Sequence, residues 1–103
     1  MIKLVSIIIP CYNSEKYIRE TVLSVINQTY ENIEILCVDN GSTDGTLKIL
    51  NTLKSDFPQI QLLIQPKKGA PAARNLGLAQ SKGEVIQFLD SDDLLIPNKI
   101  EKQ

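Results

Sequence analysis

The sequence predicts an α/β fold in which parallel strands form an open sheet with helices on both faces. Short apolar runs rich in β-branched residues alternate along the chain with segments whose apolar residues have helical spacing. The runs are almost continuously apolar, as is typical of strands that are buried on both faces. The chain has 103 residues, of which 43% are hydrophobic. We therefore expect a single domain over residues 1–103 with one core.

Four of the apolar runs are predicted to be strands. They are "LVSIII", "IEILCV", "IQLLI" and "EVIQFL", at residues 4–9, 33–38, 60–64 and 84–89. We expect Pro10 to stop the first strand, and we expect the strand order 3-2-1-4, which makes the sheet Rossmann-like. The predicted core comprises Ile7, Ile9, Ile35, Val38, Leu62, Ile86 and Phe88.

Helical spacing predicts a helix after each of the first three strands. The predicted helices cover about residues 14–28, about residues 43–54, and a segment that has Pro71 in its first turn and ends before Gly83. Asn13 or Ser14 is expected to cap the first helix, and Ser42 or Thr43 the second, because these side chains accept hydrogen bonds from free backbone N–H groups.

The composition argues against several classes of protein. Lys and Arg number 11 and Asp and Glu 12, and the sequence pI is 5.3, so we expect no nucleic-acid partner. No apolar run approaches the roughly 20 residues of a membrane span, and the N-terminal run is too short for a secretory signal. We expect a cytoplasmic location, with membrane association of the full-length protein as an alternative. Cys11 and Cys37 are expected to be reduced and buried.

Polar motifs follow the predicted strands. "PCYN" follows the first, "DNGSTDG" the second, "PKKGAPAAR" the third and "DSDD" the fourth. In open α/β sheets, ligands bind beyond the carboxyl ends of the strands, near the point where the strand order reverses. We therefore expect these motifs to surround a crevice between the first and fourth strands.

Asp90, Asp92 and Asp93 can be explained in two ways. They can form a solvated turn in which one carboxylate caps a following helix. Alternatively they lie in the crevice, where two carboxylates about 5.5 Å apart repel by roughly 3 kcal/mol at an effective dielectric constant of 20, against about 0.75 kcal/mol in water. In that case they need a cation, and Mg²⁺ commonly binds one or two carboxylates together with water and substrate phosphates.

The other polar motifs also have a structural and a functional interpretation. Asp39 can belong to an ordinary βα turn, or its carboxylate can accept a hydrogen bond from a base or ribose. Tyr12 can be a core or lid aromatic residue, or it can stack on a base. Arg74, Lys67 and Lys68 can be surface charges, or they can face a phosphate near a helix N-terminus.

Three ordered stretches of the chain resemble the glycosyltransferase family 2 enzymes. They are "VSIIIPCYNSEKYIRETVLSVINQTYENIEILCVDNGSTDGT", "KKGAPAARNLGLAQSKGE" and "FLDSDD", and they cover almost the whole chain. The resemblance implies the N-terminal nucleotide-sugar-binding half of a GT-A fold. It also implies a nucleotide-diphospho-sugar donor, expected to be a UDP-sugar, and Mn²⁺ or Mg²⁺ as cofactor. The implied reaction is inverting transfer to an acceptor hydroxyl of a sugar or lipid-linked glycan, in cell-surface polysaccharide biosynthesis.

The resemblance also assigns roles to individual residues. Pro10 and Tyr12 match the wall that binds the base, and Arg74 matches the arginine that faces the nucleotide. Asp90 and Asp92 match the family's D-x-D motif. By this resemblance Asp92 is the stronger metal ligand, and Asp90 lies nearer the ribose or a metal-bound water.

The match departs from the family pattern at two places. The acidic pair often found after the second strand is here Asp39 and Asn40, so the resemblance leaves the base selectivity open, although the amide oxygen of Asn40 can still accept a hydrogen bond. The catalytic base of the family lies well downstream of the D-x-D motif, and we expect it beyond Gln103. We therefore expect a truncated chain without the acceptor-binding part, inactive alone and able to self-associate through its uncovered surface.

Two other functional classes stay open. The first is a metal-dependent nucleotidyltransferase, which should have a glycine- and arginine-rich phosphate loop after the first strand, where this chain has "PCYNSEK". The second is a non-catalytic module for nucleotide binding or assembly.

Overall fold

The chain forms one four-stranded parallel sheet in the order β3-β2-β1-β4, as the sequence predicts. This is a computed structural model, and it describes residues 3–28 and 32–91. The strands are β1 (Val5–Cys11), β2 (Ile33–Asp39), β3 (Ile60–Ile64) and β4 (Val85–Phe88). Because β1 lies between β2 and β4, the strand order reverses beside it, and the carboxyl ends of these three strands meet at one edge of the sheet.

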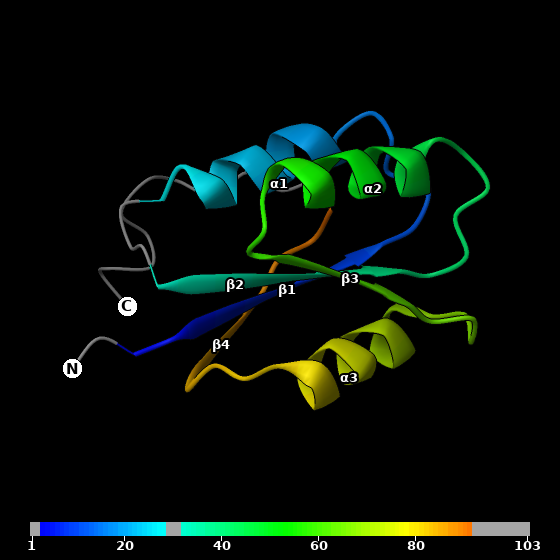
Figure 1. Cartoon of the computed structure of the whole chain (residues 1–103). Coiled ribbons are helices and arrows are strands. Elements are labelled where there is room, and N and C mark those ends of the chain that lie inside the picture. The colour runs from blue at the N-terminus through cyan, green and yellow to red at the C-terminus, as the bar shows by residue number, and fades with distance from the viewer. Residues whose placement is uncertain (1–2, 29–31, 92–103) are drawn as a thin grey trace.

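In the described part of the chain, three helices cover the two faces of the sheet. They are α1 (Ile18–Ile26), α2 (Thr46–Asp56) and α3 (Ala70–Gln80). Helices α1 and α2 lie side by side on one face and α3 lies on the other (Figure 1). Within the described ranges, every helix falls short of the length and hydrophobicity needed to cross a membrane.

Successive side chains of β1 point to opposite faces of the sheet, so the strand contributes to a core on each face. Ile7 and Ile9 belong to the cluster that packs under α1 and α2, whereas Ile8 belongs to the cluster under α3. Ala73 and Gly77 are the buried residues of α3. A Cβ atom on Gly77 would lie 2.5 Å from Cγ2 of Ile8, so glycine is what allows α3 to approach β1 this closely. The close packing fixes the N-terminus of α3 beside the carboxyl ends of the strands.

The predicted core is right for four residues and wrong for Phe88. Ile7, Ile9, Ile35 and Val38 are buried, and Leu62 and Ile86 are half-buried. Phe88 is 44% exposed. It pairs with Ile8 and so lies on the α3 face, but α3 packs over β1 and β2 and leaves the end of β4 open.

The first strand runs through Pro10 to Cys11, so the expected stop at Pro10 is wrong. Proline cannot donate to a strand ladder and is tolerated where no such bond is needed. The pairing of β1 with β4 ends at Ile8 and Phe88, and Pro10 lies beyond it. On the other side of β1 the ladder continues, with Cys11 opposite Asp39.

The predicted helix caps are also wrong. α1 begins at Ile18 and α2 at Thr46, and neither helix has a side-chain hydrogen bond at its N-cap residue, Tyr17 or Gly45. The loop before each helix is instead bonded to the loop before the other, as described below. The third helix begins as predicted, with Pro71 in its first turn.

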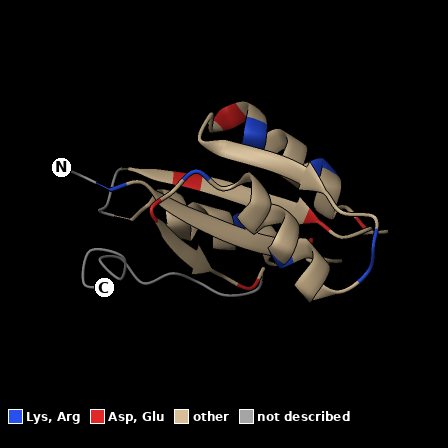
Figure 2. Cartoon of the chain, turned by 90° about the horizontal axis from the view of Figure 1, so that it is seen from below, with Lys and Arg blue, Asp and Glu red and all other residues tan. Residues whose placement is uncertain are grey.

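Charges of both signs are interspersed over the molecule. Figure 2 shows Lys and Arg alternating with Asp and Glu over several elements rather than gathered on one face. The formal net charge of the full sequence is −1. Any specific recognition of a charged ligand therefore depends on local groups, and the polar groups at the carboxyl edge of the sheet are the ones considered next.

Candidate functional site

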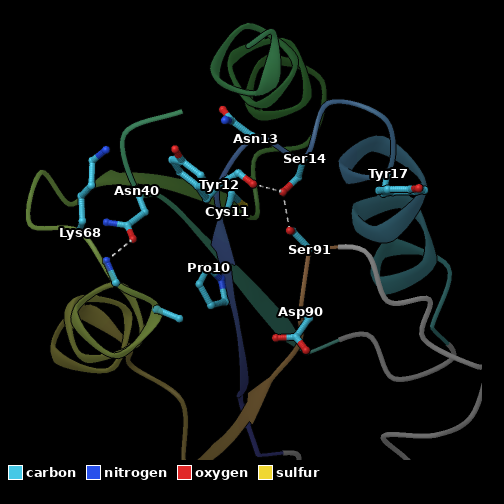
Figure 3. Close-up of a pocket in the computed structure, with 12 residues that line it drawn as sticks. Pro10, Cys11, Tyr12, Asn13, Ser14, Tyr17, Asn40, Lys68, Asp90 and Ser91 are labelled. Carbon is cyan, nitrogen blue, oxygen red and sulfur yellow. Dashed lines mark hydrogen bonds between the residues drawn. The ribbon is translucent and has the colours of Figure 1, made fainter. Parts of the chain in front are cut away.

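A pocket of about 620 Å³ lies at the carboxyl edge of the sheet. Its floor is the end of β1, and Figure 3 shows Pro10 and Tyr12 near its centre. We call one side the α3 end, made by Asn40, Lys68, Gly69 and Ala70. The opposite side, the β4 end, is made by Tyr17, Asp90 and Ser91. Cys11, Asn13 and Ser14 complete the lining.

The loop between β3 and α3 forms the wall of the α3 end. Asn40, at the carboxyl end of β2, donates from Nδ2 to the backbone oxygens of Gln65 (2.9 Å) and Lys67 (2.8 Å). Its Oδ1 accepts from the backbone N–H of Gly69 at 2.9 Å. Gly69 has a φ of +117°, a conformation that glycine adopts without strain. These bonds hold the loop against β2.

Lys68 and Tyr12 meet across the pocket. The Lys68 ammonium nitrogen lies 5.9 Å from the centroid of the Tyr12 ring, within the range of a cation–π interaction. Tyr12 is 51% exposed, so one part of its ring is available to a ligand. The α3 end therefore combines an aromatic face, a cation and the N-terminus of α3.

The loops before α1 and α2 hold each other. The N–H of Asn13 donates to Oγ of Ser42 at 3.0 Å, and the N–H of Thr43 donates to Oδ1 of Asn13 at 2.8 Å. Asn13 has a φ of +47°, which asparagine tolerates better than most residues. Two residues further on, Oε2 of Glu15 accepts from the N–H of Gly45 at 2.9 Å. This mutual link fixes the chain that follows Tyr12.

Two hydroxyl groups hold Ser91 at the β4 end. Oγ1 of Thr21 donates to the backbone oxygen of Ser91 at 2.8 Å, and the hydroxyls of Ser14 and Ser91 share a hydrogen bond. Ser14 is itself fixed, because its N–H donates to Oγ1 of Thr46 at 2.7 Å. Ser91 follows Asp90 directly, so these bonds set the position of the chain that carries the exposed Asp90 carboxylate.

Asp39 lies under the α3 end. It is 3% exposed, and its Oδ2 accepts from the N–H of Ser42 at 3.2 Å. Among the described residues, no group donates to its Oδ1. A buried carboxylate oxygen without a donor is unfavourable, and a donor supplied by a ligand would relieve that cost.

The thiol of Cys11 lies beneath the pocket and is unreactive. Cys11 and Cys37 are both buried and free, as predicted. A hydrogen bond with Cys37, burial, and the nearby charge of Asp39 raise the pKa of the Cys11 thiol well above its usual range. We therefore expect Cys11 to be a neutral thiol at physiological pH.

The structure brings together four of the seven predicted site residues. Pro10, Tyr12, Asn40 and Asp90 line the pocket. Asp39 lies next to Asn40 at the end of β2, and Arg74 is half-buried on α3 away from the lining. Asp92, like Asp93, lies outside the described residues. Sequence reasoning named Lys68 as a surface charge or a phosphate partner, and it did not select Ser14, Tyr17, Gly69 or Ser91 as site residues.

The donor groups at the β4 end suit a hard divalent cation in part. Asp90 presents an exposed carboxylate beside the pocket. In residues 3–28 and 32–91, no three His, Cys, Asp or Glu side chains converge as a metal site would require. Mg²⁺ or Mn²⁺ can be held by one or two carboxylates when water and phosphate oxygens complete the coordination. The described residues fit such a ligand-assisted site and not a site made by protein alone.

Comparison with known proteins identifies related sequences. Residues 6–103 match the family model described as glycosyl transferase family 2. An uncharacterized glycosyltransferase of Haemophilus influenzae is 45% identical over 101 residues, which are 97% of this chain and 40% of the relative. The chain thus spans less than half the length of that relative.

Two solved structures share the fold over nearly all of this chain. S. aureus TarS 1-349 in complex with UDP-GlcNAc has a TM-score of 0.83 and 32% sequence identity, covering 96% of this chain and 29% of that one. A mannosyltransferase from Pyrobaculum calidifontis in complex with GDP-Man and Mn²⁺ has a TM-score of 0.88 and 27% identity, covering 95% of this chain and 30% of that one.

Proposed function

The chain belongs to glycosyl transferase family 2, and from this premise we propose that its pocket binds the nucleotide-diphospho-sugar donor of an inverting glycosyltransferase, with a UDP-sugar as donor and a divalent cation as cofactor. One observation carries the proposal. A single pocket at the carboxyl edge of the sheet has an aromatic ring and a cation at one side and a carboxylate at the other. A nucleotide diphosphate has matching parts in the same order: a base, a ribose and an anion that needs a cation.

The base is assigned to the α3 end. Tyr12 supplies a half-exposed ring for stacking, and Pro10 supplies an apolar floor. The free Oδ1 of Asp39 is suited to accept a hydrogen bond from a ring N–H, which uracil possesses. The complexes with UDP-GlcNAc and GDP-Man formed by the two related structures support a nucleotide-sugar ligand.

The ribose and diphosphate are assigned to the β4 end. Asp90 and Asp92 would hold the divalent cation, with Asp92 as the stronger ligand and Asp90 nearer the ribose or a metal-bound water. The complex of the mannosyltransferase with Mn²⁺ supports a divalent ion, without favouring Mn²⁺ over Mg²⁺ in this chain. A bound divalent cation would neutralise the negative charge that grows on the leaving diphosphate.

The reaction in this proposal is one displacement at the anomeric carbon. The acceptor oxygen attacks from the face opposite the diphosphate, the bond between sugar and phosphate oxygen breaks, and the configuration inverts. The acceptor hydroxyl transfers its proton to a carboxylate. No described residue is proposed as that base. The acceptor, a sugar or a lipid-linked glycan, is assigned to protein outside this pocket.

Titration with UDP tests the proposal. We expect weak binding to the purified chain that Mn²⁺ or Mg²⁺ strengthens, and perturbation of the NMR signals of Tyr12 and Lys68 on saturation. A chain that binds neither UDP nor GDP at millimolar concentration, with or without metal, would contradict the donor-binding function.

An assembly role is the alternative that a specific observation favours. Val85 and Phe88 are exposed on β4, which forms an edge of the described sheet. Exposed apolar side chains on an edge strand favour self-association. Light scattering of the wild-type chain and of Phe88→Ser tests this role: a dimer that the substitution dissociates supports it, and a monomeric wild-type chain contradicts it.

A further inference from the structure

The side chain of Asn40 is saturated by bonds to the protein. It is 6% exposed, and its two Nδ2 protons are directed at the backbone oxygens of Gln65 and Lys67 while its Oδ1 accepts from Gly69. The network determines the orientation of the carboxamide, since a flip would place Oδ1 against two carbonyl oxygens and Nδ2 against an N–H group. All three partners belong to one loop, 25 to 29 positions further along the chain.

That loop has other bonds that depend on the same arrangement. The N–H of Gln65 donates to the backbone oxygen of Asp39 at 2.9 Å, and the N–H of Lys67 donates to Oε1 of Gln65 at 3.0 Å. Lys68 lies between two residues that Asn40 holds, and its own side chain extends over Tyr12 (Figure 3). The backbone on both sides of Lys68 is therefore held by Asn40, and this sets the point from which the Lys68 side chain extends.

We propose that Asn40 is a positioning residue, whose carboxamide holds the loop between β3 and α3 and thereby places Lys68 beside the base subsite. The ligand group that Lys68 meets is a carbonyl oxygen of a base stacked on Tyr12, because an ammonium group donates and cannot accept. This inference rests on the proposed nucleotide-sugar function. It assigns base recognition to Lys68 and removes Asn40 from direct contact with the base.

The chemistry of the position requires an amide. A carboxylate at residue 40 keeps the shape of the side chain, yet it has no protons for the oxygens of Gln65 and Lys67 and would face them with negative charge. Alanine removes all three bonds without adding charge. Asn40→Asp and Asn40→Ala therefore disturb the loop in two different ways, and only the first introduces a charge.

The wild-type chain alone gives the first test. With no ligand present, the two carboxamide protons of Asn40 should exchange slowly with solvent, and their NMR shifts should change less than that of the Tyr12 amide on saturation with UDP. Fast exchange without ligand would show that the loop does not hold the carboxamide, and a shift change larger than that of Tyr12 would show that Asn40 contacts the nucleotide. Either result would overturn the proposal.

A double-mutant cycle gives the second test. Asn40→Asp should weaken the binding of UDP and of uncharged uridine by about tenfold each, the size of a lost hydrogen bond to a charged group. In a Lys68→Ala background the same change should cost less than about twofold, because both substitutions remove one contact. An equal loss in both backgrounds would overturn the proposal, and a loss confined to UDP would indicate charge repulsion instead.

Two controls separate this inference from the proposed function. Asn51→Asp introduces the same charge on α2, where Asn51 is exposed and bonds to the oxygen of Leu47 within its own helix. It should leave uridine and UDP affinity unchanged. If the wild-type chain binds no nucleotide, the proposed function fails. Hydrogen exchange of the Gly69 amide still tests whether Asn40 holds the loop between β3 and α3. The exchange rate of the Gly69 amide should rise at least about tenfold in Asn40→Ala, because the hydrogen bond from Gly69 N–H to Asn40 is lost. An unchanged rate would show that Asn40 does not hold the loop.

Discussion

The two ends of the pocket are held by different side-chain groups, a carboxamide at the α3 end and hydroxyls at the β4 end. At the α3 end, the polar side chain that points toward the pocket, Asn40, is fully bonded to the protein, and the exposed groups are Tyr12 and Lys68. At the β4 end, buried hydroxyls of Thr21 and Ser14 hold the backbone and side chain of Ser91, and the neighbouring Asp90 stays exposed.

The difference shows which groups are built to position and which are free to bind. A side chain whose donors and acceptors are all matched by protein gains little from a ligand, whereas an exposed carboxylate or a buried oxygen without a donor can gain a partner. The α3 end is therefore suited to stack a base on Tyr12 and to donate to it from Lys68, and the β4 end, with its exposed carboxylate, is suited to a cation. The following predictions test this separation.

The largest effect is expected from removing the carboxylate charge of Asp92, which the proposed function assigns to the divalent cation. Asp92→Asn should abolish most of the strengthening of UDP binding by Mn²⁺ or Mg²⁺, a loss of about 3 kcal/mol on the scale of one charge pair in a partly exposed crevice. Discrimination between UDP and other nucleoside diphosphates should remain. Titration calorimetry with and without metal measures both. Asp93→Asn is the matched control, and equal, small effects of the two substitutions would exclude the D-x-D assignment.

The reverse pattern is expected from a change at the α3 end. Asp39→Asn should weaken uridine and UDP alike by about 1 to 3 kcal/mol, because the ring N–H then faces an amide in place of a carboxylate. The strengthening by metal should be preserved. If Asp39→Asn instead abolished the effect of metal, the two ends could not be assigned to separate parts of the ligand.

A smaller effect is expected from loosening the β4 end without changing its charge. Thr21→Val removes the hydroxyl that bonds to the oxygen of Ser91 and should lower the free energy of unfolding by about 1 kcal/mol. The effect of metal on UDP binding should decline, while uridine affinity stays the same. Thr52→Val removes a hydroxyl from the exposed side of α2 and serves as the control in urea denaturation.

The smallest effect is expected between the two ends, at Cys11. Because a hydrogen bond with Cys37 and burial raise its pKa, the thiol stays protonated in the folded chain at pH 8, where a free cysteine is partly ionised. Because both thiols are buried, iodoacetamide should modify Cys11 and Cys37 only as fast as the chain unfolds, as mass spectrometry can follow. Rapid alkylation of the folded chain would mean that the floor of the pocket opens.

The sheet could be predicted from the sequence because each of its determinants is local. Runs such as "IEILCV" are apolar at every position but one, so burial on both faces of the sheet can be expected without knowing which elements pack against the strand. The helix starts could not be predicted in this way. Ser14 has the side chain of a cap, but its N–H and hydroxyl are bonded to Thr46 and Ser91, which are distant in sequence.

Part of the candidate site could likewise be predicted from the sequence, and part of it could not. Tyr12 and Asp90 could be selected because strand ends gather at one edge of a parallel sheet. The bonds of Asn40 could not, since two of its partners are backbone oxygens, which carry no sequence signal. Phe88 has the pattern of a core residue, and its exposure depends on where α3 lies over the sheet.

Because the loops before α1 and α2 are bonded to each other, their two short motifs form one structural unit. Asn13 bonds to both Ser42 and Thr43, and Glu15 bonds to Gly45. Transplanting "YNSE" alone into another α/β scaffold would leave these donors and acceptors unmatched, whereas transplanting it together with "GSTDG" would carry the complete set. To graft Tyr12 and its surroundings onto a new protein, one would therefore have to transfer both loops together.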